Sequence, residues 1–412
     1  MNKILLLCST CAVLAFPSAA EDFNIKLGAH AFLDYENISV GGNNMVDGTN
    51  LRLFRVDVGG SANGYKFKSN FDIKNGDVFI RDLFVEFGDE LTVRVGNFKI
   101  MNGLEQQSSL YATTFMEQSS VSKMNGLGRS LGVGLYRSFG DFHLSGAVYG
   151  PDANVVEDID LFGASARLAW TNTFADESIL HLGGSLRYRD SNDQSLFSYS
   201  QRPLGSSAPR TVRVGGTAET DLFLGVEAAY INDGFTLQGE YGVTEIDCPP
   251  TLCASDPQAE AFYVDASYVW GGHRVYRNSL FSRTSVDQSI HDGGRGAFQL
   301  SARYDMADLS DAALNGGSQD TYILGGTWYL DQYVRLMVNI AHTEYDNSPS
   351  YGNGDADSVL RLSFTKEYSH AVQISISFGC DRGTSFVLHE RRQRAISDGC
   401  PVCRPDRRCF YR

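Results

Sequence analysis

Apolar and polar residues alternate along most of this 412-residue chain, and this period of two constrains the fold more than any other feature. In LTVRVGNF, for example, Leu91, Val93 and Val95 alternate with polar or small residues that include Arg94. Successive side chains of a strand point to opposite faces, so each such segment has one apolar and one polar face. After residue 20, no stretch reaches the roughly 18 consecutive apolar residues of a transmembrane helix. The pattern therefore predicts an all-β protein.

The chain holds sixteen alternating segments, which start near residues 25, 51, 65, 78, 90, 130, 141, 161, 178, 219, 234, 259, 296, 319, 333 and 357. Most even-numbered joints are short, as in SANG, GDE and INDG. The odd-numbered joints are longer, apart from 75–76, and span 39–49, 99–129, 150–160, 191–218, 247–258, 308–318 and 346–356. An even strand count with short turns at one end and long loops at the other is typical of a bacterial outer-membrane barrel.

A sheet in lipid must close so that no backbone group stays unpaired. We therefore expect a 16-stranded antiparallel transmembrane β-barrel over residues 21–364, with apolar side chains toward lipid and polar side chains toward a water-filled lumen. A soluble secreted β-sandwich is the alternative, because the same alternation would fit it. The strand count, the rhythm of the joints and the many outward aromatic residues favour the barrel.

The two ends of the chain differ from the rest. MNKILLLCSTCAVLAFPSAA has a basic start, a short apolar stretch and a small-residue cleavage site, which predicts a signal peptide over 1–20. Residues 365–412 form an atypical basic extension that contains cysteines, with 370–378 as a possible further strand. Residues 21–364 carry 25 Lys/Arg and 44 Asp/Glu, and this acidity disfavours nucleic acid as a partner.

Strand parity places eleven cations on the inner face, against ten acids, and this balance does not decide the ion preference of a pore. The inward cations are Lys26, Arg55, Lys66, Lys68, Arg94, Arg167, Arg187, Arg189, Arg303, Arg335 and Arg361. Residues 194–218 contain Arg202, Arg210 and Arg213 and no acid. These residues bring cations into the lumen if they fold inward; otherwise they form a solvated loop.

Two further connections bear on the lumen. Joint twelve lies at the short-turn end, yet residues 273–295 are long and basic, with Arg274, Arg277, Arg283 and Arg295 against two acids. We expect this joint, too, to enter the lumen. The 99–129 loop is the expected constriction, and its cations are Lys99, Lys123 and Arg129. Lys123 is the best single candidate for a central anion contact, although pairing with Glu117 is an equal alternative.

The run from Arg81 to Gly150 resembles the phosphate-selective porin O and P family, through IRDLFVEFGDELTVRVGNFKIMNGLEQQSS, YATTFMEQ and GRSLGVGLY. The late segments GAFQLSARYD and DADSVLRLSF are similar to that family as well. The resemblance implies a sixteen-stranded porin with an inward-folded constriction loop, usually a trimer, that passes small anions. Gln118 stands where the family usually has a basic residue, which leaves phosphate selectivity less secure than the fold.

Other motifs are weak. GLGRSLG (126–132) has the wrong spacing for a dinucleotide site and precedes a strand. NGDAD (353–357) has calcium-loop spacing without the later Glu, and Cys248 and Cys253 could form a small loop disulfide. No catalytic arrangement stands out, so we expect no enzyme activity, no cofactor and no metal site.

We therefore expect an outer-membrane porin for small anions, phosphate-like or organic acids. The partners would be these solutes, outer-membrane lipid and lipopolysaccharide, and two further copies in a homotrimer. A general or cation-preferring porin, or a barrel with a structural or adhesive role, is the alternative. The candidate anion-pathway residues are Arg94, Lys123, Arg129, Arg167, Arg187, Arg189, Arg213, Arg274, Arg277, Arg335 and Arg361.

Overall fold

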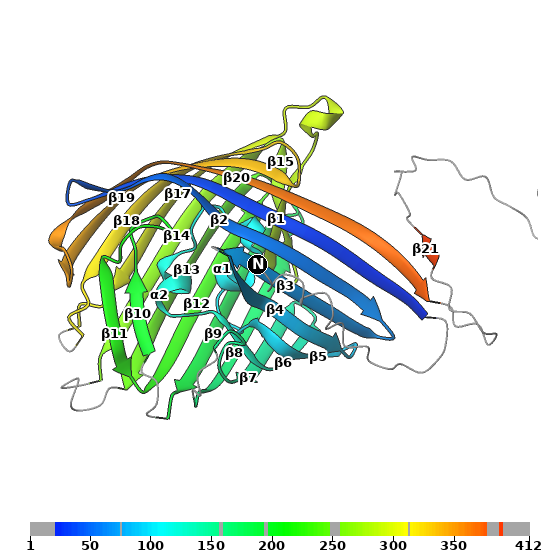
Figure 1. Ribbon diagram of the computed structural model, residues 1–412, viewed down its shortest axis with the longest axis horizontal. Helices are drawn as coiled ribbons and strands as arrows, with labels where there is room; N and C mark the ends of the chain where they lie inside the picture. The colour runs from blue at the N-terminus through cyan, green and yellow to red at the C-terminus, as the bar shows by residue number, and fades with distance from the viewer. Residues whose placement is uncertain are drawn as a thin grey trace, which may run out of the picture. The chain divides into compact units, whose positions relative to one another are not determined.

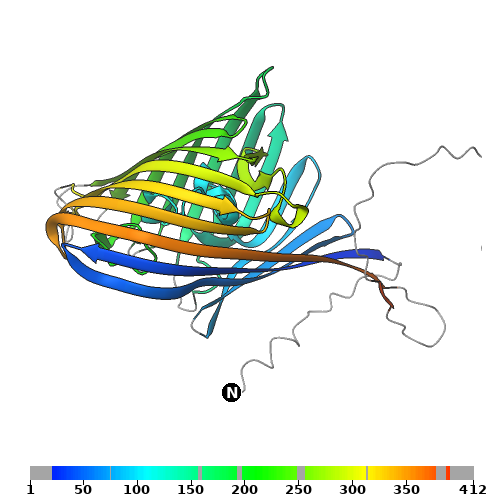
Figure 2. The same cartoon turned by 90° about the horizontal axis from the view of Figure 1, so that it is seen from above.

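The computed structural model describes residues 21–74, 76–155, 160–192, 197–247, 256–311, 314–376 and 387–389. Residues 25–371 form one compact unit, in which sixteen antiparallel strands close into a barrel (Figure 1, Figure 2). The ring closes because the last barrel strand, β20, pairs with β1. In the second unit, Gln373–Ser375 of β20 pair with β21 (Val387–His389). The predicted fold class is confirmed.

All sixteen predicted segments are barrel strands. The first eight are β1 (Glu21–Val40), β2 (Asn43–Ala62), β3 (Tyr65–Lys74), β4 (Asp77–Phe87), β5 (Leu91–Lys99), β6 (Arg129–Phe139), β7 (Phe142–Tyr149) and β8 (Phe162–Thr173). The other eight are β9 (Ile179–Asp190), β12 (Thr220–Asn232), β13 (Phe235–Asp247), β14 (Gln258–Trp270), β17 (Ala297–Asp308), β18 (Ser318–Tyr329), β19 (Val334–Ser348) and β20 (Gly352–Ile376).

Two joints that were predicted to be long are tight turns. β1 and β2 extend to residues 40 and 43, so residues 41–42 alone connect them. Gly41 and Gly42 have φ of 56° and 75°, a conformation that glycine adopts without a steric cost and that suits a two-residue hairpin turn. β19 likewise ends at residue 348 and β20 begins at 352. Polar residues there continue the strand, because ladder pairing does not require an apolar face.

The last strand runs beyond Phe364, the expected end of the barrel, to Ile376. Residues 370–376, which were considered as a possible further strand, belong to β20 itself. The predicted signal peptide, Cys248, Cys253 and the basic extension from residue 390 lie outside the described residues.

The outer face of the barrel is apolar. Leu131, Leu300 and Leu324 point outward and are 54%, 60% and 63% exposed. Aromatic pairs mark the rim that carries the short turns: Phe139 stacks on Phe142, and Phe298 lies parallel to Trp328. This arrangement of an apolar band with an aromatic girdle suits a bilayer. None of the described helices has the length and hydropathy to cross a membrane.

Three inserts fold against the inner face. The constriction segment (residues 100–128) contains α1 (Leu104–Gln107), η1 (Leu110–Ala112) and α2 (Ser120–Met124). The strap (residues 197–218) contains β10 (Phe197–Gln201) and β11 (Val212–Ala218). At the short-turn rim, β15 (Gly272–Arg277) and β16 (Leu280–Val286) form the β15–β16 hairpin, which η2 (Ile290–Asp292) follows.

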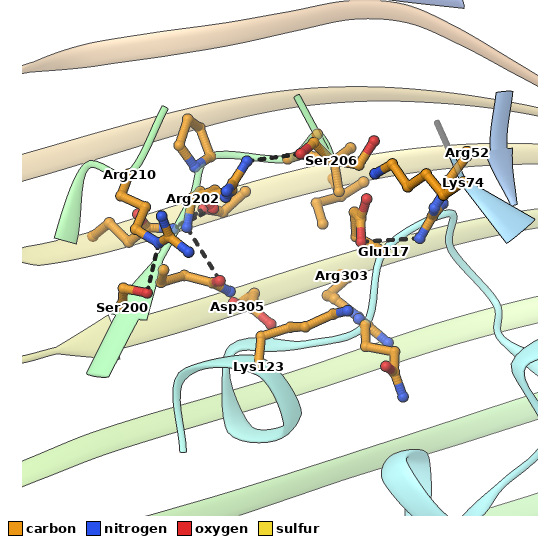
Figure 3. Close-up of a pocket in the computed structure, with 18 of the residues that line it drawn as sticks. Arg52, Lys74, Glu117, Lys123, Ser200, Arg202, Ser206, Arg210, Arg303 and Asp305 are labelled. Atoms are coloured by element: carbon orange, nitrogen blue, oxygen red, sulfur yellow. Dashed lines mark hydrogen bonds and ion pairs between the residues drawn. The ribbon is translucent and has the colours of Figure 1, made fainter. Parts of the chain in front are cut away.

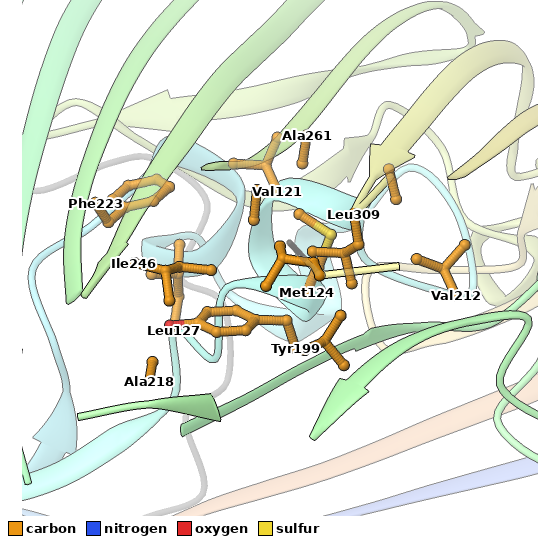
Figure 4. Packing of buried hydrophobic residues seen from close by; sticks show 14 of the residues in the cluster. Val121, Met124, Leu127, Tyr199, Val212, Ala218, Phe223, Ile246, Ala261 and Leu309 are labelled. Atoms are coloured by element: carbon orange, nitrogen blue, oxygen red, sulfur yellow. The ribbon is translucent and has the colours of Figure 1, made fainter. Parts of the chain in front are cut away.

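An apolar cluster joins two of these inserts to the wall (Figure 4). Val121 and Met124 of α2 pack with Tyr199 of β10 and with Phe223 of β12, all of them buried. The inner face thus has its own small core, which the alternation of wall residues alone does not predict. This core fixes the constriction segment and the strap on one side of the lumen.

Candidate functional site: a basic cavity in the lumen

Wall carboxylates hold the constriction segment in place. The Glu240 carboxylate on β13 accepts the backbone N–H groups of Leu104 (2.9 Å) and Glu105 (2.6 Å). The Asp305 carboxylate on β17 accepts the N–H of Ser120 at 2.9 Å, at the start of α2. Buried N–H groups at a helix start need such acceptors. Part of the acidity of the chain therefore serves to position this segment.

The strap crosses the lumen to the opposite wall. On β1, the Glu36 carboxylate accepts the Ser206 hydroxyl (2.6 Å) and the Ser207 N–H (3.0 Å). On β18, the Gln319 amide donates to the Arg202 carbonyl at 3.1 Å. The strap therefore links the β9–β12 side to β1 and β18, as expected if residues 191–218 entered the lumen.

The β15–β16 hairpin also folds inward, as predicted for joint twelve. Arg274 donates to the side chain of Gln238 at 3.0 Å and to the carbonyl of Ala112 at 3.1 Å. The Tyr276 hydroxyl lies 2.6 Å from Nδ1 of His181 on β9. The hairpin thus contacts both the wall and the end of η1, and it supports the constriction segment from the short-turn side.

A cavity of about 380 Å³ lies between the constriction segment, the strap and the wall (Figure 3). Two acids line it, Glu117 and Asp305. Seven cations line it: Arg52, Lys74, Arg81, Lys123, Arg202, Arg210 and Arg303. This strong excess of positive charge contrasts with the acidic barrel around it.

Carboxylates neutralise three of the seven cations. The ion pairs are Arg52–Glu117 (3.0 Å), Arg81–Asp72 (2.5 Å) and Arg303 with both Glu105 (2.7 Å) and Asp265 (2.6 Å). In the part of the chain that the structure describes, no carboxylate lies within 4.0 Å of the charged groups of the other four, Lys74, Lys123, Arg202 and Arg210. Arg202 instead donates to the carbonyls of Ser206 and Ala208, and Arg210 donates to the Ser200 hydroxyl.

The positive charges in the cavity act on one another. Lys123 borders the cavity but is surrounded by protein, and this partial burial lowers its pKa, with Arg52 and Arg81 adding to the effect. Burial also lowers the pKa of Arg210, as do Arg202 and Arg213 nearby. Burial is the larger cause of both shifts and disfavours charge of either sign, whereas the neighbouring arginines disfavour a further cation and attract anions.

Of the predicted site residues, Lys123 lines the cavity, whereas five wall and loop arginines are paired elsewhere. Their partners are Glu86 for Arg94, Asp82 for Arg129, Glu227 for Arg167, and Asp221 for both Arg187 and Arg189. Arg94, expected to point into open water, lies over the rings of Phe84 and Tyr136 at 4.2 and 4.4 Å. Parity placed the four wall arginines, Arg94, Arg167, Arg187 and Arg189, on the inner face, but the same face supplies their acids.

The remaining candidates have other positions. Arg274 and Arg335 donate to carbonyls of the constriction segment and lie outside the cavity. Arg213 is exposed on β11 near Arg210, and Arg277 is exposed at the tip of the β15–β16 hairpin. Arg361 lies opposite Asn339 in the β19–β20 ladder, and its side chain is outside the described residues.

Six cations that line the cavity were not among the candidate residues: Arg52, Lys74, Arg81, Arg202, Arg210 and Arg303. Arg202 and Arg210 stood in an acid-free run, and that signal could have identified them. Arg81 was missed because the β3–β4 register shifts between Ser69 and Phe71. Parity fails at such a bulge, so that Arg81 and Asp82 both make contacts inside the barrel.

Comparisons with known proteins agree with this architecture. The profile of the family described as phosphate-selective porin O and P matches residues 23–368. An uncharacterised protein of Caulobacter vibrioides is 26% identical over 332 residues, which cover 75% of this chain. The aligned region covers just under two thirds (66%) of that relative's length.

Two solved structures share the fold at low identity. An anion-selective porin from Comamonas acidovorans has a TM-score of 0.55 at 13% identity, covering 84% of this chain and all of that one. A trimer form of OmpT, an outer membrane protein of Vibrio cholerae, has a TM-score of 0.52 at 13% identity, covering 85% of this chain and all of that one. These findings agree with the closed sixteen-stranded barrel, whose lumen contains the three inserts of the chain. The chain therefore belongs to the phosphate-selective porin O and P family and is a porin of the bacterial outer membrane.

Proposed function

We propose that this porin is a passive channel for small anions, which cross the lumen through the basic cavity. The observation that carries the proposal is the set of four lining cations without a carboxylate partner among the described residues: Lys74, Lys123, Arg202 and Arg210. Ion preference depends on the charges that line the narrow part of a pore rather than on the total charge. An arginine guanidinium also presents a flat fork of donors that suits phosphate or carboxylate oxygens.

The proposal assigns different roles to two sets of cations. The paired wall arginines are structural, and Lys123, Arg202 and Arg210 contact the passing anion. The description of the family and that of the Comamonas porin both support an anion preference. We further propose a homotrimer, as in the trimer form of OmpT, embedded among outer-membrane lipid and lipopolysaccharide.

Reversal potentials in planar bilayers test the proposal. In a potassium chloride gradient, the wild-type protein should give the sign of an anion-preferring channel. The triple variant Lys123→Gln, Arg202→Gln, Arg210→Gln should move the reversal potential strongly toward zero or to the opposite sign. Arg137→Gln is the matched control, because Arg137 is exposed at the short-turn rim, away from the cavity.

A cation-preferring wild type, or a triple variant with an unchanged reversal potential, would contradict the assignment. Absence of any conductance from folded protein would contradict the channel itself. Replacing chloride by phosphate and then by a small dicarboxylate on one side would rank the solute classes. Gln118 lines the cavity, and Gln118→Lys should raise the preference for phosphate by adding a cation there.

A further inference from the structure

The cations of the basic cavity that lack a carboxylate partner among the described residues belong to two groups. Arg202 and Arg210, which we term the strap arginines, lie on the strap. Lys74 at the end of β3 and Lys123 on α2, which we term the cavity lysines, lie on the wall and on the constriction segment. Figure 3 shows the strap arginines on one side of the cavity and Lys74 beside Arg52 on the other.

Electrostatic influence follows the same division. Burial lowers the pKa of Lys123, and Arg52 and Arg81, on β2 and β4, lower it further. Burial also lowers the pKa of Arg210, and the other two arginines of the strap add to this effect. An anion that crosses the cavity therefore meets two centres of positive charge, one at the strap and one near the cavity lysines.

The strap arginines are held in place but keep donors to offer. Arg202 uses Nη1 to donate to the carbonyls of Ser206 and Ala208, and Arg210 uses Nε to donate to the Ser200 hydroxyl. Within the described ranges, their other guanidinium N–H groups form no hydrogen bond with the protein. Two N–H groups on the planar end of an arginine match the two oxygens of one carboxylate.

Apolar side chains lie between the two groups. Leu204 of the strap and Ile323 of β18 line the cavity, and both pack with Phe115 of the constriction segment. The strap runs from Arg202, which is bonded to β18, past Leu204 to Ser206, which is bonded to β1. The strands next to β1 are β2 and β3, and β3 ends in one of the cavity lysines. A solute that reaches from one group to the other therefore passes along an apolar surface.

The size and the lining of the cavity suit an organic anion with two charged ends. Its volume of about 380 Å³ lies in the range of small-molecule sites, roughly 300–1,000 Å³. A compact ion such as phosphate engages one group of cations at a time. A short carbon chain with a carboxylate at each end engages both groups, while its methylene groups lie against Leu204 and Ile323. Building on the proposed anion channel, we propose that this cavity selects small dicarboxylates.

Reversal potentials with a different anion on each side of the bilayer test the inference. Potassium chloride on one side faces the potassium salt of succinate, sulfate or propionate on the other. Sulfate matches the charge of succinate but is compact, and propionate matches its carbon chain but has one carboxylate. Succinate should be about threefold to tenfold more permeant than either, as expected for one additional charged contact. Sulfate or propionate permeability equal to that of succinate would overturn the inference.

Two variants test the two ends separately. Arg210→Gln removes a charge from the strap arginines and Lys74→Gln removes one from the cavity lysines, and both residues are exposed, so that folding does not depend on them. Each variant should lower the ratio of succinate to propionate permeability to about one. Arg137→Gln, at the short-turn rim, is the control and should leave the ratio unchanged. An equal proportional loss for all three anions would indicate general attraction and would contradict a two-ended site.

The selectivity of the same channels in a potassium chloride gradient separates this inference from the proposed function. An anion-preferring channel that passes sulfate as readily as succinate would contradict the dicarboxylate selectivity alone. A cation-preferring wild type would contradict the proposed anion channel as well.

Discussion

Arginines of the barrel wall and cations of the inserted segments have opposite surroundings in the same lumen. Arg303 on β17 is 4% exposed and donates to Glu105 and Asp265. Lys123 and Arg210, on the constriction segment and the strap, border the cavity without a carboxylate within 4.0 Å among the described residues. The number of cations on the inner face therefore does not predict anion preference, because a cation that is paired with a carboxylate does not attract a passing anion.

The difference follows from the chain's own layout. Several cross-strand neighbours on the wall are an acid and a base on the same face, so ladder pairing brings them into contact. Arg303, for example, is opposite Asp265 in the β14–β17 ladder and donates to it at 2.6 Å. The strap carries arginines and no acid between residues 194 and 218, and its carboxylate anchor, Glu36, binds a hydroxyl and an N–H instead. In the described part of the chain, no carboxylate pairs with Arg202 or Arg210, and we propose that these arginines contact the solute.

The variant Arg303→Met should have the largest effect and tests whether wall arginines contribute more to stability than strap arginines. The substitution leaves Glu105 and Asp265 buried without their cation, and we expect the free energy of unfolding to fall by about 3–5 kcal/mol. Guanidinium chloride unfolding in detergent, followed by tryptophan fluorescence, measures it. Arg210→Met is the control and should change stability by no more than about 0.5 kcal/mol. Equal losses from both variants would mean that wall and strap arginines do not differ.

A second prediction concerns the strap anchor. Glu36→Ala removes the acceptor for the Ser206 hydroxyl and the Ser207 N–H, which should cost about 1–3 kcal/mol of local stability. The released strap would widen the pore and withdraw Arg202 and Arg210. Single-channel conductance should rise and anion preference should fall. Asp47→Ala, which removes an outward carboxylate bonded to Tyr35, should alter neither. Unchanged conductance in Glu36→Ala would show that the strap does not narrow the pore.

A third prediction uses pH to test whether Lys123 contributes to the anion preference. Burial lowers the pKa of Lys123 below its ordinary value of about 10.4, so its ammonium loses its charge earlier as pH rises. Anion preference should therefore be full at low pH and decline on the alkaline side, before ordinary lysines titrate. Lys123→Arg should abolish the decline, since arginine stays protonated throughout. The same decline in wild type and variant would assign it to another group.

The smallest expected effect is at the short-turn rim. Arg137 and Glu90 are 4.0 Å apart, with side chains 56% and 92% exposed. Such a pair is screened by water and salt, so Arg137→Gln should change stability by less than about 0.5 kcal/mol and leave the reversal potential unaltered. A large shift of the reversal potential would indicate that charges outside the cavity also set ion preference.

Most of the barrel could be predicted because its signal is local. Each strand can be recognised from the alternation of apolar and polar residues over eight or more positions, without knowing which strands it pairs with. The turn at residues 41–42 was missed because the alternation changes face along β1: Leu27 and Leu33 point outward, whereas Ile38 and Val40 near its end are buried on the inner side. Lys123 was found from its place in the loop, but Arg81 was missed because a bulge broke the parity.

Sequence alone determined a closed barrel of sixteen strands, its apolar exterior and the inward direction of most wall charges, since these depend on periodicity and on the need to pair every backbone group in lipid. Only the tertiary structure showed which cations are paired with a carboxylate and which are not. That outcome depends on contacts between residues far apart in the chain, such as Arg303 with Glu105 and Gln319 with the carbonyl of Arg202. Pairing of charges is a matter of distance in space, and no sequence period encodes it.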